Sequence, residues 1–511
     1  MLQRRKLSGL LAVILAAPAG AAAAAAAASP PVHSFADVSQ VFNVARPSRN
    51  TTTVLFLGSV AAAPACAAAC AALAPQRCWS FTFLGAGAPG GLAQQCFGLT
   101  SPRWNPVPVA PAEGVVSGWL EWPCRDDFDC SLNGQCGADG VCACNRAWRG
   151  PRCEALALQP ATKGAGFEPV DDGAPTTTWG GNTVPCGGSR AGQFCMFASE
   201  ITRHCGIAAW AQNSRVVMAT SASPTGSFTR TNVSWPVFSH EPSATLAPTG
   251  EIALFLTASN PPRAPTCACV NGSTDPGDCG AAAARAAPGL GDSDPTLLTY
   301  APSADGPWST PQQLFVGHKG ADLNFSPIIF QNGSVLAMWR TWTGLGSRVF
   351  LATAPDWRNA SSYVMHGQEL FPDLSEAGTE DMFLYRAPDG SFHAIFHHMV
   401  GINTTSTWWL VAAGAHAFSR DGLSWEYGGL AWGNSTTQGY DAHFTDGSAF
   451  HYTRLERPAF IFDAHDGLPS ALMNAAQYGT GRSASGSSGG DAAYTLIQPI
   501  AGASGGAESA V

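Results

Sequence analysis

Between about residues 160 and 500, short stretches of alternating hydrophobic and polar residues are separated by turns rich in Gly, Asp and Asn. Alternation with a period of two is typical of β-strands that bury one face, and a Gly-containing turn between two such stretches predicts a hairpin. One pattern, a strand followed by a Gly turn and an aromatic-rich strand, occurs at residues 244–258, 328–341, 383–399 and 460–475. The chain is therefore expected to be mainly β.

A second hairpin pattern recurs at a distance from the first, at residues 218–230, 299–310, 351–363 and 416–427. The segments 177–184 and 192–200 supply the opening strands of the first copy. Five copies at a spacing of roughly 60 residues indicate an internal repeat. Because a ring of four-stranded sheets protects most strand edges, the repeat favours a five-bladed β-propeller over residues 160–500. The Gly-, Ser- and Ala-rich residues 480–511 are expected to form a flexible tail.

The first residues resemble an export signal. Basic residues at positions 4–6 precede an apolar stretch and a run of alanines, which is typical of a secretory signal peptide, here residues 1–28. An uncleaved signal anchor is the alternative, because residues 10–28 nearly reach membrane-spanning length. Pro18 and Gly20 favour cleavage. We expect a secreted chain without a membrane span once the signal is removed.

Residues 35–122 contain four cysteines: Cys66, Cys70, Cys78 and Cys96. The first two lie one helical turn apart, and Cys78 directly precedes an alternating stretch. The apolar residues 54–74 therefore fit a helix packed under a disulfide better than a membrane segment. The segment resembles a PAN/apple module, in which disulfides join a helix to a small sheet. The resemblance implies protein or carbohydrate binding, and a disulfide-linked spacer is the alternative.

Six cysteines crowd into residues 123–154: Cys124, Cys130, Cys136, Cys142, Cys144 and Cys153. So short a segment has little core and is held by disulfides, although the spacing alone leaves many connectivities open. The spacing resembles an EGF-like domain, which implies the pairs Cys124–Cys136, Cys130–Cys142 and Cys144–Cys153. Residues 119–124 lack the acidic run of calcium-binding EGF domains, so no calcium is expected. Receptor or matrix contact is one interpretation, and a rigid spacer is the other.

Cysteine content and glycosylation motifs agree with export. The chain has 16 cysteines, and an even number at high density is typical of an oxidising compartment. We expect three further disulfides, and no metal site, from Cys186, Cys195, Cys205, Cys267, Cys269 and Cys279. Eight Asn-x-Ser/Thr motifs favour a secreted glycoprotein: Asn50, Asn232, Asn271, Asn324, Asn332, Asn359, Asn403 and Asn434.

The charge pattern argues against nucleic acid as a partner. The formal net charge is −9, only three of the 27 basic residues are lysines, and no basic block occurs beyond the N-terminus. The sequence has no phosphate loop, no Gly-x-Ser-x-Gly and no His-Glu-x-x-His pattern. We therefore expect no cofactor and no metal.

The repeated hairpins resemble the five-bladed propellers of glycoside hydrolase family 43 and its arabinanase, levansucrase and invertase relatives. The phrases that match best are ATSASPTGSFTR and APSADGPWST, from two outer hairpins. The resemblance implies a catalytic Asp opening the first blade, an Asp in the third and a Glu, the general acid, in the fourth. Glu380, with Asp381 beside it, matches the fourth. The other two segments offer Asn182 and Ser326 instead of an Asp, so the usual catalytic trio is incomplete.

Two other blade starts carry carboxylates, Glu241 in the second blade and Glu456 in the fifth. With Glu380 and Asp381 they predict a funnel lined by four carboxylates, in which a different pair does the acid and base work. Candidate sugar-binding residues near strand ends are His240, Arg340, His397, His398, His416 and Arg457, and candidate stacking residues are Trp179, Trp339 and Trp432. The structural alternatives are satisfied polar groups and tryptophans packed between blades.

Two functions remain open. The first is an enzyme that hydrolyses an extracellular carbohydrate, with Glu380 as acid. The second is a non-catalytic extracellular protein that binds carbohydrate in the funnel and proteins through its small modules, as adhesion and matrix proteins do. Two carboxyls about 5–10 Å apart in an open pocket would favour hydrolysis. A Glu380 tied to an arginine in a closed funnel would favour binding.

Overall fold

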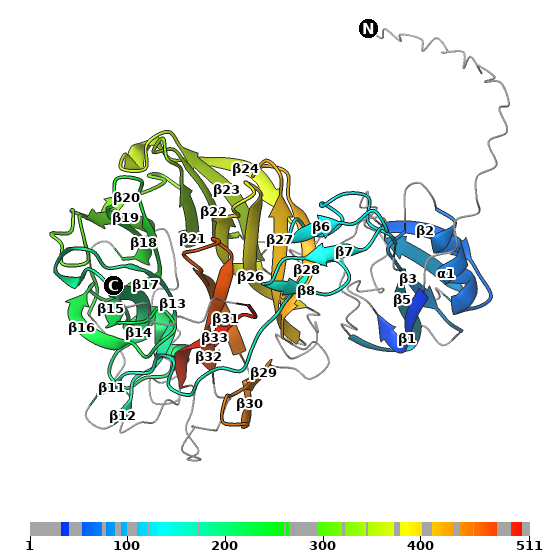
Figure 1. Ribbon diagram of the computed structural model, residues 1–511, viewed down its shortest axis with the longest axis horizontal. Helices are drawn as coiled ribbons and strands as arrows, with labels where there is room; N and C mark the ends of the chain where they lie inside the picture. Colours follow the sequence, from blue (N-terminus) through cyan, green and yellow to red (C-terminus); the bar gives the residue numbers. More distant parts are fainter. Residues whose placement is uncertain are drawn as a thin grey trace, which may run out of the picture.

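The computed structural model confirms that the chain is mainly β (Figure 1). It describes residues 32–39, 54–73, 78–86, 93–99, 110–120, 122–171, 174–259, 262–264, 269, 294–318, 322–343, 346–371, 379–400, 411–433, 440–452, 454–477 and 492–502. The predicted signal peptide, residues 1–28, lies outside these ranges. Within them, no helix is both long enough and apolar enough to span a membrane.

Five four-stranded sheets make up most of the described part of the chain after residue 160. Their strands are β13 (Thr178–Pro185), β14 (Phe194–Ile201), β15 (Ser214–Ser221) and β16 (Thr229–Ser234); β17 (Ser239–Leu246), β18 (Ile252–Ala258), β19 (Thr296–Ala301) and β20 (Gln312–Gln313); β21 (Asp322–Ile329), β22 (Val335–Thr343), β23 (Gly346–Ala354) and β24 (Val364–Leu370); β25 (Thr379–Arg386), β26 (Phe392–Val400), β27 (Val411–Ser419) and β28 (Glu426–Trp432); and β31 (Arg454–Phe462), β32 (Pro469–Gln477), β33 (Ala493–Pro499) and β10 (Gly166–Phe167). The first strands β13, β17, β21, β25 and β31 contact one another in a closed ring, so the sheets radiate from one axis.

The fifth sheet is built from both ends of this region. Its order is β31, β32, β33 and β10, and β10 lies in the chain before the first sheet. Gly166 pairs with Leu496 across this junction. The tail predicted over residues 480–511 is therefore wrong for Ala493–Pro499, because these residues form β33 and are almost entirely buried.

The middle strands are buried on both faces, whereas the sequence pattern predicted the burial of one face. Every residue of β18 is buried, and all of β32 except Ser470. Sheets pack face to face around the ring: the rings of Phe255 on β18 and Phe325 on β21 stack at 4.9 Å. A strand covered on both faces needs a continuous hydrophobic run, which explains the ALFL and ALM segments of these strands.

Smaller elements and two disulfides complete the ring. The elements are hairpins β11 (Val170–Asp171) with β12 (Ala174–Pro175) and β29 (Tyr440–His443) with β30 (Ala449–Tyr452), helix α2 (Trp210–Asn213), and the 3-10 turns η2 (Gly188–Arg190), η3 (Ile207–Ala209) and η4 (Ala360–Ser362). The disulfides are Cys186–Cys195 and Cys205–Cys269. Of the six cysteines expected here, Cys267 and Cys279 lie outside the described residues.

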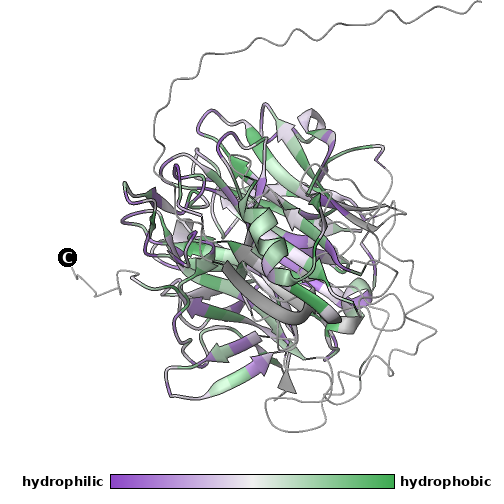
Figure 2. Ribbon diagram, turned by 90° about the vertical axis from the view of Figure 1, so that its right-hand side faces the viewer, coloured by the Kyte–Doolittle hydropathy of each residue, from purple (hydrophilic) through white to green (hydrophobic). Residues whose placement is uncertain are grey.

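The first module is a five-stranded sheet with one helix. In sheet order its strands are β1 (Val32–Ser39), β5 (Ala110–Leu120), β3 (Ser80–Leu84), β4 (Gln95–Leu99) and β2 (Val54–Ser59). Helix α1 (Ala63–Ala71) is apolar on all sides (Figure 2). The disulfide Cys66–Cys96 joins it to β4, and Cys70–Cys78 joins it to the segment before β3. The helix expected over residues 54–74 is thus present only at Ala63–Ala71, because Val54–Ser59 forms β2, and the PAN/apple assignment stays a prediction.

The second module has two short hairpins, β6 (Gly134–Cys136) with β7 (Cys142–Cys144) and β8 (Trp148–Arg149) with β9 (Ala155–Leu156). Its three disulfides are those that the EGF-like resemblance implied. The module packs against the ring: the Trp148 ring lies 4.6 Å from that of His416 on β27, and Arg146 makes an ion pair with Asp466 at 2.8 Å. The face around Trp148 is therefore covered by the ring.

Candidate functional site

The first strand of every sheet carries the same irregularity near its start. Each has a β-bulge, and at each bulge one residue has a positive φ: Gly180 (64°), Glu241 (55°), Asn324 (54°), Asp381 (61°) and Arg457 (51°). A bulge bends the strand and re-aims a side chain out of the regular alternation. Because the five strands surround one axis, these residues occupy equivalent places around it.

Arg457 fills the place left by glycine in the first sheet. A Cβ atom added to Gly180 would lie 2.5 Å from Cβ of Arg457, so no larger residue fits without displacing the arginine. Arg457 Nη1 is 2.9 Å from Glu241 Oε1, and its Nε is 3.6 Å from Asp381 Oδ1. All three side chains are less than one-tenth exposed. One guanidinium therefore joins the carboxylates of the second and fourth sheets.

Asn324 connects the same carboxylates from the third sheet. Its main-chain N–H donates to Glu241 Oε2 at 2.8 Å, and its Nδ2 donates to Asp381 Oδ1 at 2.9 Å. Its Oδ1 accepts from Arg340 Nη1 at 3.1 Å. Both oxygens of Glu241 are thus engaged, one by Arg457 and one by Asn324.

A second group of charges extends from Arg340. Its Nη1 donates to Glu380 Oε2 at 2.6 Å, and Glu380 Oε1 lies 3.1 Å from His397 Nδ1. His397 Nε2 is 3.6 Å from Glu456 Oε1, which is also 3.6 Å from Arg454 Nε. All four carboxylates named from the sequence thus belong to one cluster in which cations separate them, but of the four only Glu241 and Asp381 line the pocket described below.

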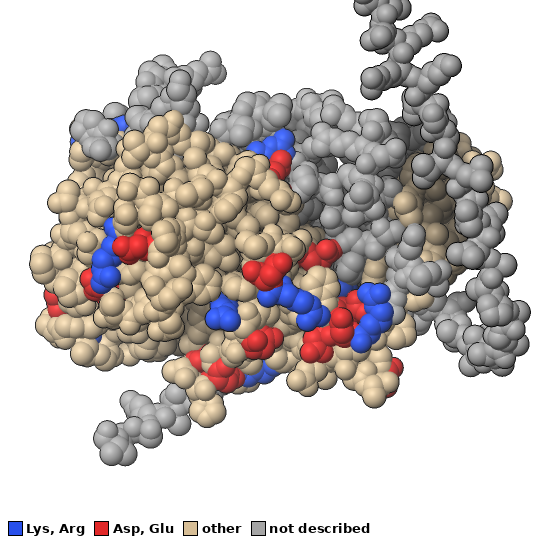
Figure 3. Space-filling view, turned by 90° about the horizontal axis from the view of Figure 1, so that it is seen from above, with Lys and Arg blue, Asp and Glu red and all other residues tan. Residues whose placement is uncertain are grey.

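The charges of this cluster balance. The carboxylates of Glu241, Glu380, Asp381 and Glu456 face three arginines and His397. Figure 3 shows a similar mixture on one outer face, where acidic and basic side chains lie in small groups of both signs. Neither the cluster nor that face presents a field of one sign.

The surroundings of Glu380 favour its ionised form, not the protonated form that the family resemblance implied for a proton donor. Burial acts to raise its pKa, but the Arg340 guanidinium and the hydrogen bond and charge of His397 outweigh it and lower the pKa to about 2. Burial acts in the opposite direction on His397, whose pKa is nevertheless raised to about 9 by Glu456 and Glu380. At neutral pH this pair is a carboxylate beside an imidazolium.

The pKa of Asp381 is shifted in the opposite direction to that of Glu380. Burial raises its pKa to about 7, against the attraction of Arg457 and with a further contribution from the charges of Glu380, Glu241 and Glu456. Asp381 also occupies the bulge position, whereas Glu380 is the residue before it. Of the two adjacent acids, Asp381 is the one able to hold a proton near neutral pH.

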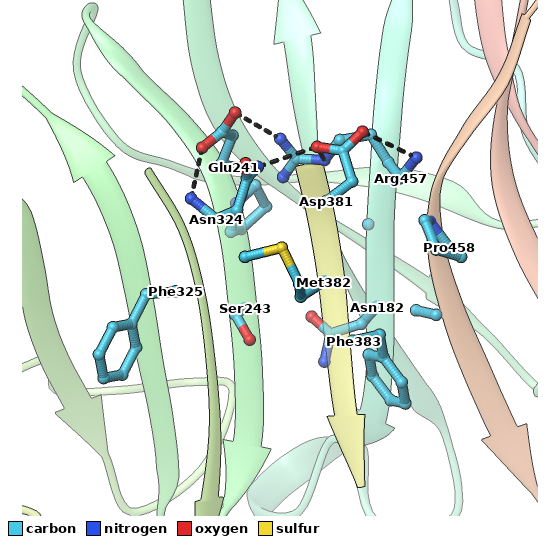
Figure 4. Close-up of a pocket in the computed structure, with 13 residues that line it drawn as sticks. Asn182, Glu241, Ser243, Asn324, Phe325, Asp381, Met382, Phe383, Arg457 and Pro458 are labelled. Atoms are coloured by element: carbon cyan, nitrogen blue, oxygen red, sulfur yellow. Dashed lines mark hydrogen bonds and ion pairs between the residues drawn. The ribbon is translucent and has the colours of Figure 1, made fainter. Parts of the chain in front are cut away.

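A small pocket with a volume of about 40 Å³ lies beside this cluster along the axis (Figure 4). Glu241, Asp381 and Arg457 lie at one end of it, and Ser243, Met382 and Asn182 lie farther along the strands. The Asn182 side chain is occupied by the main chain of Ala244, to which it donates and from which it accepts. Apart from Asn324, the remaining lining carries no polar side chain and includes Phe325, Phe383 and Pro458.

Several predicted sugar-binding residues lie elsewhere. His398 is bonded to the Tyr427 hydroxyl at 2.9 Å, and His416 lies under Trp148 of the second module. His240 Nδ1 forms a hydrogen bond with Ser214 Oγ at 2.6 Å, and its ring stacks on Trp210. None of the three histidines is among the residues that line the pocket, and each has a partner within the described structure, so sugar binding by them stays a prediction. Arg340 and Arg457 do belong to the central cluster.

The tryptophans are also packing residues. Trp179, Trp339 and Trp432 are each at most 5% exposed. The Trp339 ring lies 5.3 Å from that of Phe315, which follows β20 of the second sheet, and Trp432 donates its Nε1–H to the carbonyl of Leu455 in the fifth sheet. Inter-sheet packing, the alternative considered for them, is their role.

Sequence reasoning missed Gly180 and Asn324. In the sequence, Asn324 stands out only as a glycosylation motif, yet it bonds both Glu241 and Asp381. A usable signal exists, because Gly, Asn and Asp are the residues that most readily adopt positive φ. In three of the five first strands such a residue (Gly180, Asn324 or Asp381) is the third residue of the strand and marks the bulge.

Four donor groups of the cluster have a spacing that a metal ion would tolerate. Ligand atoms of Glu380, Asp381, His397 and Glu456 lie within 4.8 Å of one another. However, Arg340 and Arg457 already neutralise two of these groups, and a cation would have to compete with both guanidiniums. We assign no metal to the cluster.

Comparison with known proteins supports parts of this description. A family model, the teneurin-like EGF domain, matches residues 127–155. Among solved structures, the catalytic domain of a Coprinopsis cinerea GH62 α-L-arabinofuranosidase aligns with 67% of this chain and 97% of its own, at 11% identity and a TM-score of 0.43. An endo-arabinase from Bacteroides thetaiotaomicron aligns with 63% of this chain and 94% of its own, at 12% identity and a TM-score of 0.38. No curated protein matches the sequence.

These identities and TM-scores describe a distant likeness of fold alone. The EGF-like match agrees with the cysteine spacing and with the three disulfides. The chain thus contains an EGF-like domain, and the sheets after it resemble the propellers of GH43 and GH62 glycosidases.

Proposed function

We propose that the ring is a carbohydrate-binding domain of an extracellular protein and that it does not hydrolyse its ligand. The pocket has the mixture that a sugar requires. Glu241 and Arg457 offer an acceptor and a donor to hydroxyl groups, Ser243 adds a hydroxyl, and Met382 and Pro458 offer apolar surface to C–H faces. Because the neighbouring charges balance, a neutral ligand fits better than a charged one. The resemblance of the repeated hairpins to carbohydrate-active propellers agrees with this class of ligand.

The observation that carries the proposal is the position of Arg457. Glycoside hydrolysis requires one carboxylate free to activate water or attack the sugar, and a second carboxyl that carries a proton. Arg457 occupies the space over Gly180, where a first-sheet carboxylate would stand, and it holds Glu241 and Asp381. Glu380, the acid expected from the sequence, is held as an anion by Arg340.

Titration of the full chain with neutral oligosaccharides tests this proposal. We expect saturable binding and no release of reducing sugar. Ser243→Phe fills the pocket, and we expect it to weaken binding at least about tenfold, or about 1.4 kcal/mol. Ser223→Phe, in the exposed turn after β15, is the matched control and should leave affinity unchanged. Equal affinity of the two variants, or steady hydrolysis by the unmodified chain, would contradict the proposal.

Hydrolysis with Asp381 as acid and Glu241 as base is the second candidate. The raised pKa of Asp381, about 7, favours it. The acid must be protonated, so the rate should fall as the pH rises through about 7. Asp381→Asn should abolish this activity, whereas Glu380→Gln should leave it measurable, since Glu380 donates no proton. A rate that is insensitive to Asp381→Asn would eliminate this candidate.

The extracellular location is part of the proposal. It is supported by seven disulfides among the described residues and by the signal-like residues 1–28. A secreted chain should begin after about residue 28, as N-terminal sequencing can determine. Retention of the complete chain in membranes would favour the signal anchor. Contacts with extracellular proteins are assigned to the first two modules, through surfaces other than the Trp148 face.

A further inference from the structure

We propose that Asn332 and Asn359 carry N-linked oligosaccharides and that Asn324, in the same sheet, carries none. The inference rests on the extracellular location proposed above. It extends that proposal by assigning three of the eight glycosylation motifs, and it separates these three by their surroundings in the fold.

Four of the eight motifs lie in the part of the chain that the structure describes: Asn232, Asn324, Asn332 and Asn359. Asn324 is 4% exposed, and its amide is bonded to Asp381 and Arg340 on the ring axis. A glycan on its Nδ2 would break the Asp381 hydrogen bond and require space inside the charge cluster. Once the ring has folded, this motif is closed to modification.

Asn332 and Asn359 are exposed and share one local geometry. Asn332 Oδ1 accepts from the main-chain N–H of Ser334 at 3.0 Å and from its hydroxyl at 2.7 Å. Asn359 Oδ1 accepts from Ser361 in the same way, at 3.2 and 2.7 Å. In both motifs the amide oxygen is held by the motif's own serine. In the described structure, neither Nδ2 donates a hydrogen bond.

The chemistry of the modification matches this arrangement. Nδ2 forms a bond to the anomeric carbon of an oligosaccharide carried on a lipid diphosphate. The bond from that carbon to the diphosphate breaks, and the amide loses one proton. The motif requires Ser or Thr at its third position, and in both motifs the hydroxyl of that serine is bonded to the amide oxygen of the asparagine.

Both sites lie at the end of the third sheet that is remote from the charge cluster. Strand β21 runs from the bulge at Asn324 to Ile329, and Asn332 lies in the turn that follows. Strand β23 returns to the same end, where the Trp357 N–H donates to the Gly333 carbonyl at 3.0 Å and Asn359 follows. Glycans on these turns would cover one end of the sheet and leave Glu241, Asp381 and Arg457 uncovered.

The test uses the full chain secreted from a eukaryotic host. Glycans are removed by an amidase in heavy-oxygen water, which converts each modified Asn into a labelled Asp, and the peptides are read by mass spectrometry. We expect label at positions 332 and 359 and none at 324. Ser334→Ala and Ser361→Ala should each remove one glycan, while Ser334→Thr should keep it.

Label at Asn324, or its absence from either Asn332 or Asn359 in the secreted chain, would overturn the inference. Failure here is distinguishable from failure of the carbohydrate-binding proposal. Oligosaccharide titration of the double variant Asn332→Gln/Asn359→Gln reports on the pocket alone, and we expect affinity equal to that of the unmodified sequence.

Discussion

Replacing Arg457 with leucine is expected to lower the free energy of unfolding by about 3–5 kcal/mol, the usual cost of breaking a buried ion pair from one side. The arginine is the shared partner of Glu241 and Asp381, and all three side chains are less than one-tenth exposed. Its loss leaves two buried carboxyls without a cation. Asp381 would respond with a further rise of its pKa, because Arg457 is the main influence that lowers it. Urea denaturation followed by tryptophan fluorescence measures the effect.

Arg454→Leu is the matched control. Arg454 belongs to the same strand and faces Glu456, but its side chain is 39% exposed. An exposed ion pair contributes little, so the expected loss is less than about 1 kcal/mol. The double variant Arg457→Leu/Glu241→Gln should recover part of the stability, because it removes one uncompensated charge. If Arg457→Leu were no more destabilising than Arg454→Leu, the shared-cation description would be wrong.

Acidification from pH 7 to 4.5 is expected to loosen the EGF-like domain from the ring. Trp148 packs on His416, whose ring nitrogen lies 2.9 Å from that of His393. Burial lowers the pKa of His393 to about 4, although Asp389 acts to raise it, and burial and the neighbouring His393 lower that of His416 well below its usual value. Both histidines are neutral when docked. Their contribution to the stability of the docked state is complete above about pH 6.5, the pKa of histidine in the unfolded chain. It is lost as the pH falls toward 4.

Hydrogen exchange of the second module at the two pH values would measure this loosening. His393→Gln keeps a hydrogen-bonding side chain but cannot be protonated. A shift from 6.5 to about 4 corresponds to about 3 kcal/mol, so this variant should lose that much of the pH dependence. His451→Gln, at an exposed hairpin, should change nothing. Identical acid sensitivity of His393→Gln and the unmodified chain would exclude the histidine pair as the cause.

The repeated hairpins and the EGF-like disulfides could be predicted because both depend on local spacing. Strands β17 and β18, for example, follow directly from the turn at Gly250 and the alternation around it. The EGF-like pairs follow from cysteine positions within about 30 residues. The fifth sheet could not be completed in this way, since β10 is only two residues long and its partner β33 lies at the other end of the region.

The site was harder to predict than the fold because it depends on register. A shift of one residue exchanges the two faces of a strand. The bulge in β25 determines that Asp381 takes the axial position and that Glu380 turns toward Arg340 and His397. The contact of Arg457 with Gly180 joins the last sheet to the first, and no local pattern in the sequence specifies it.

The closure of the ring by β10 also determines when the domain can form during synthesis. Gly166 leaves the ribosome long before Leu496, its partner in the fifth sheet. Until β33 has been made, the fifth sheet has no attachment for β10, and the hydrophobic faces of its neighbours stay uncovered. Premature termination before residue 493 would therefore yield an open arc of sheets with unpaired edges, which is a substrate for chaperones and for aggregation. Cellular quality control would thus treat a truncation that removes β33 as severely as a defect in the core.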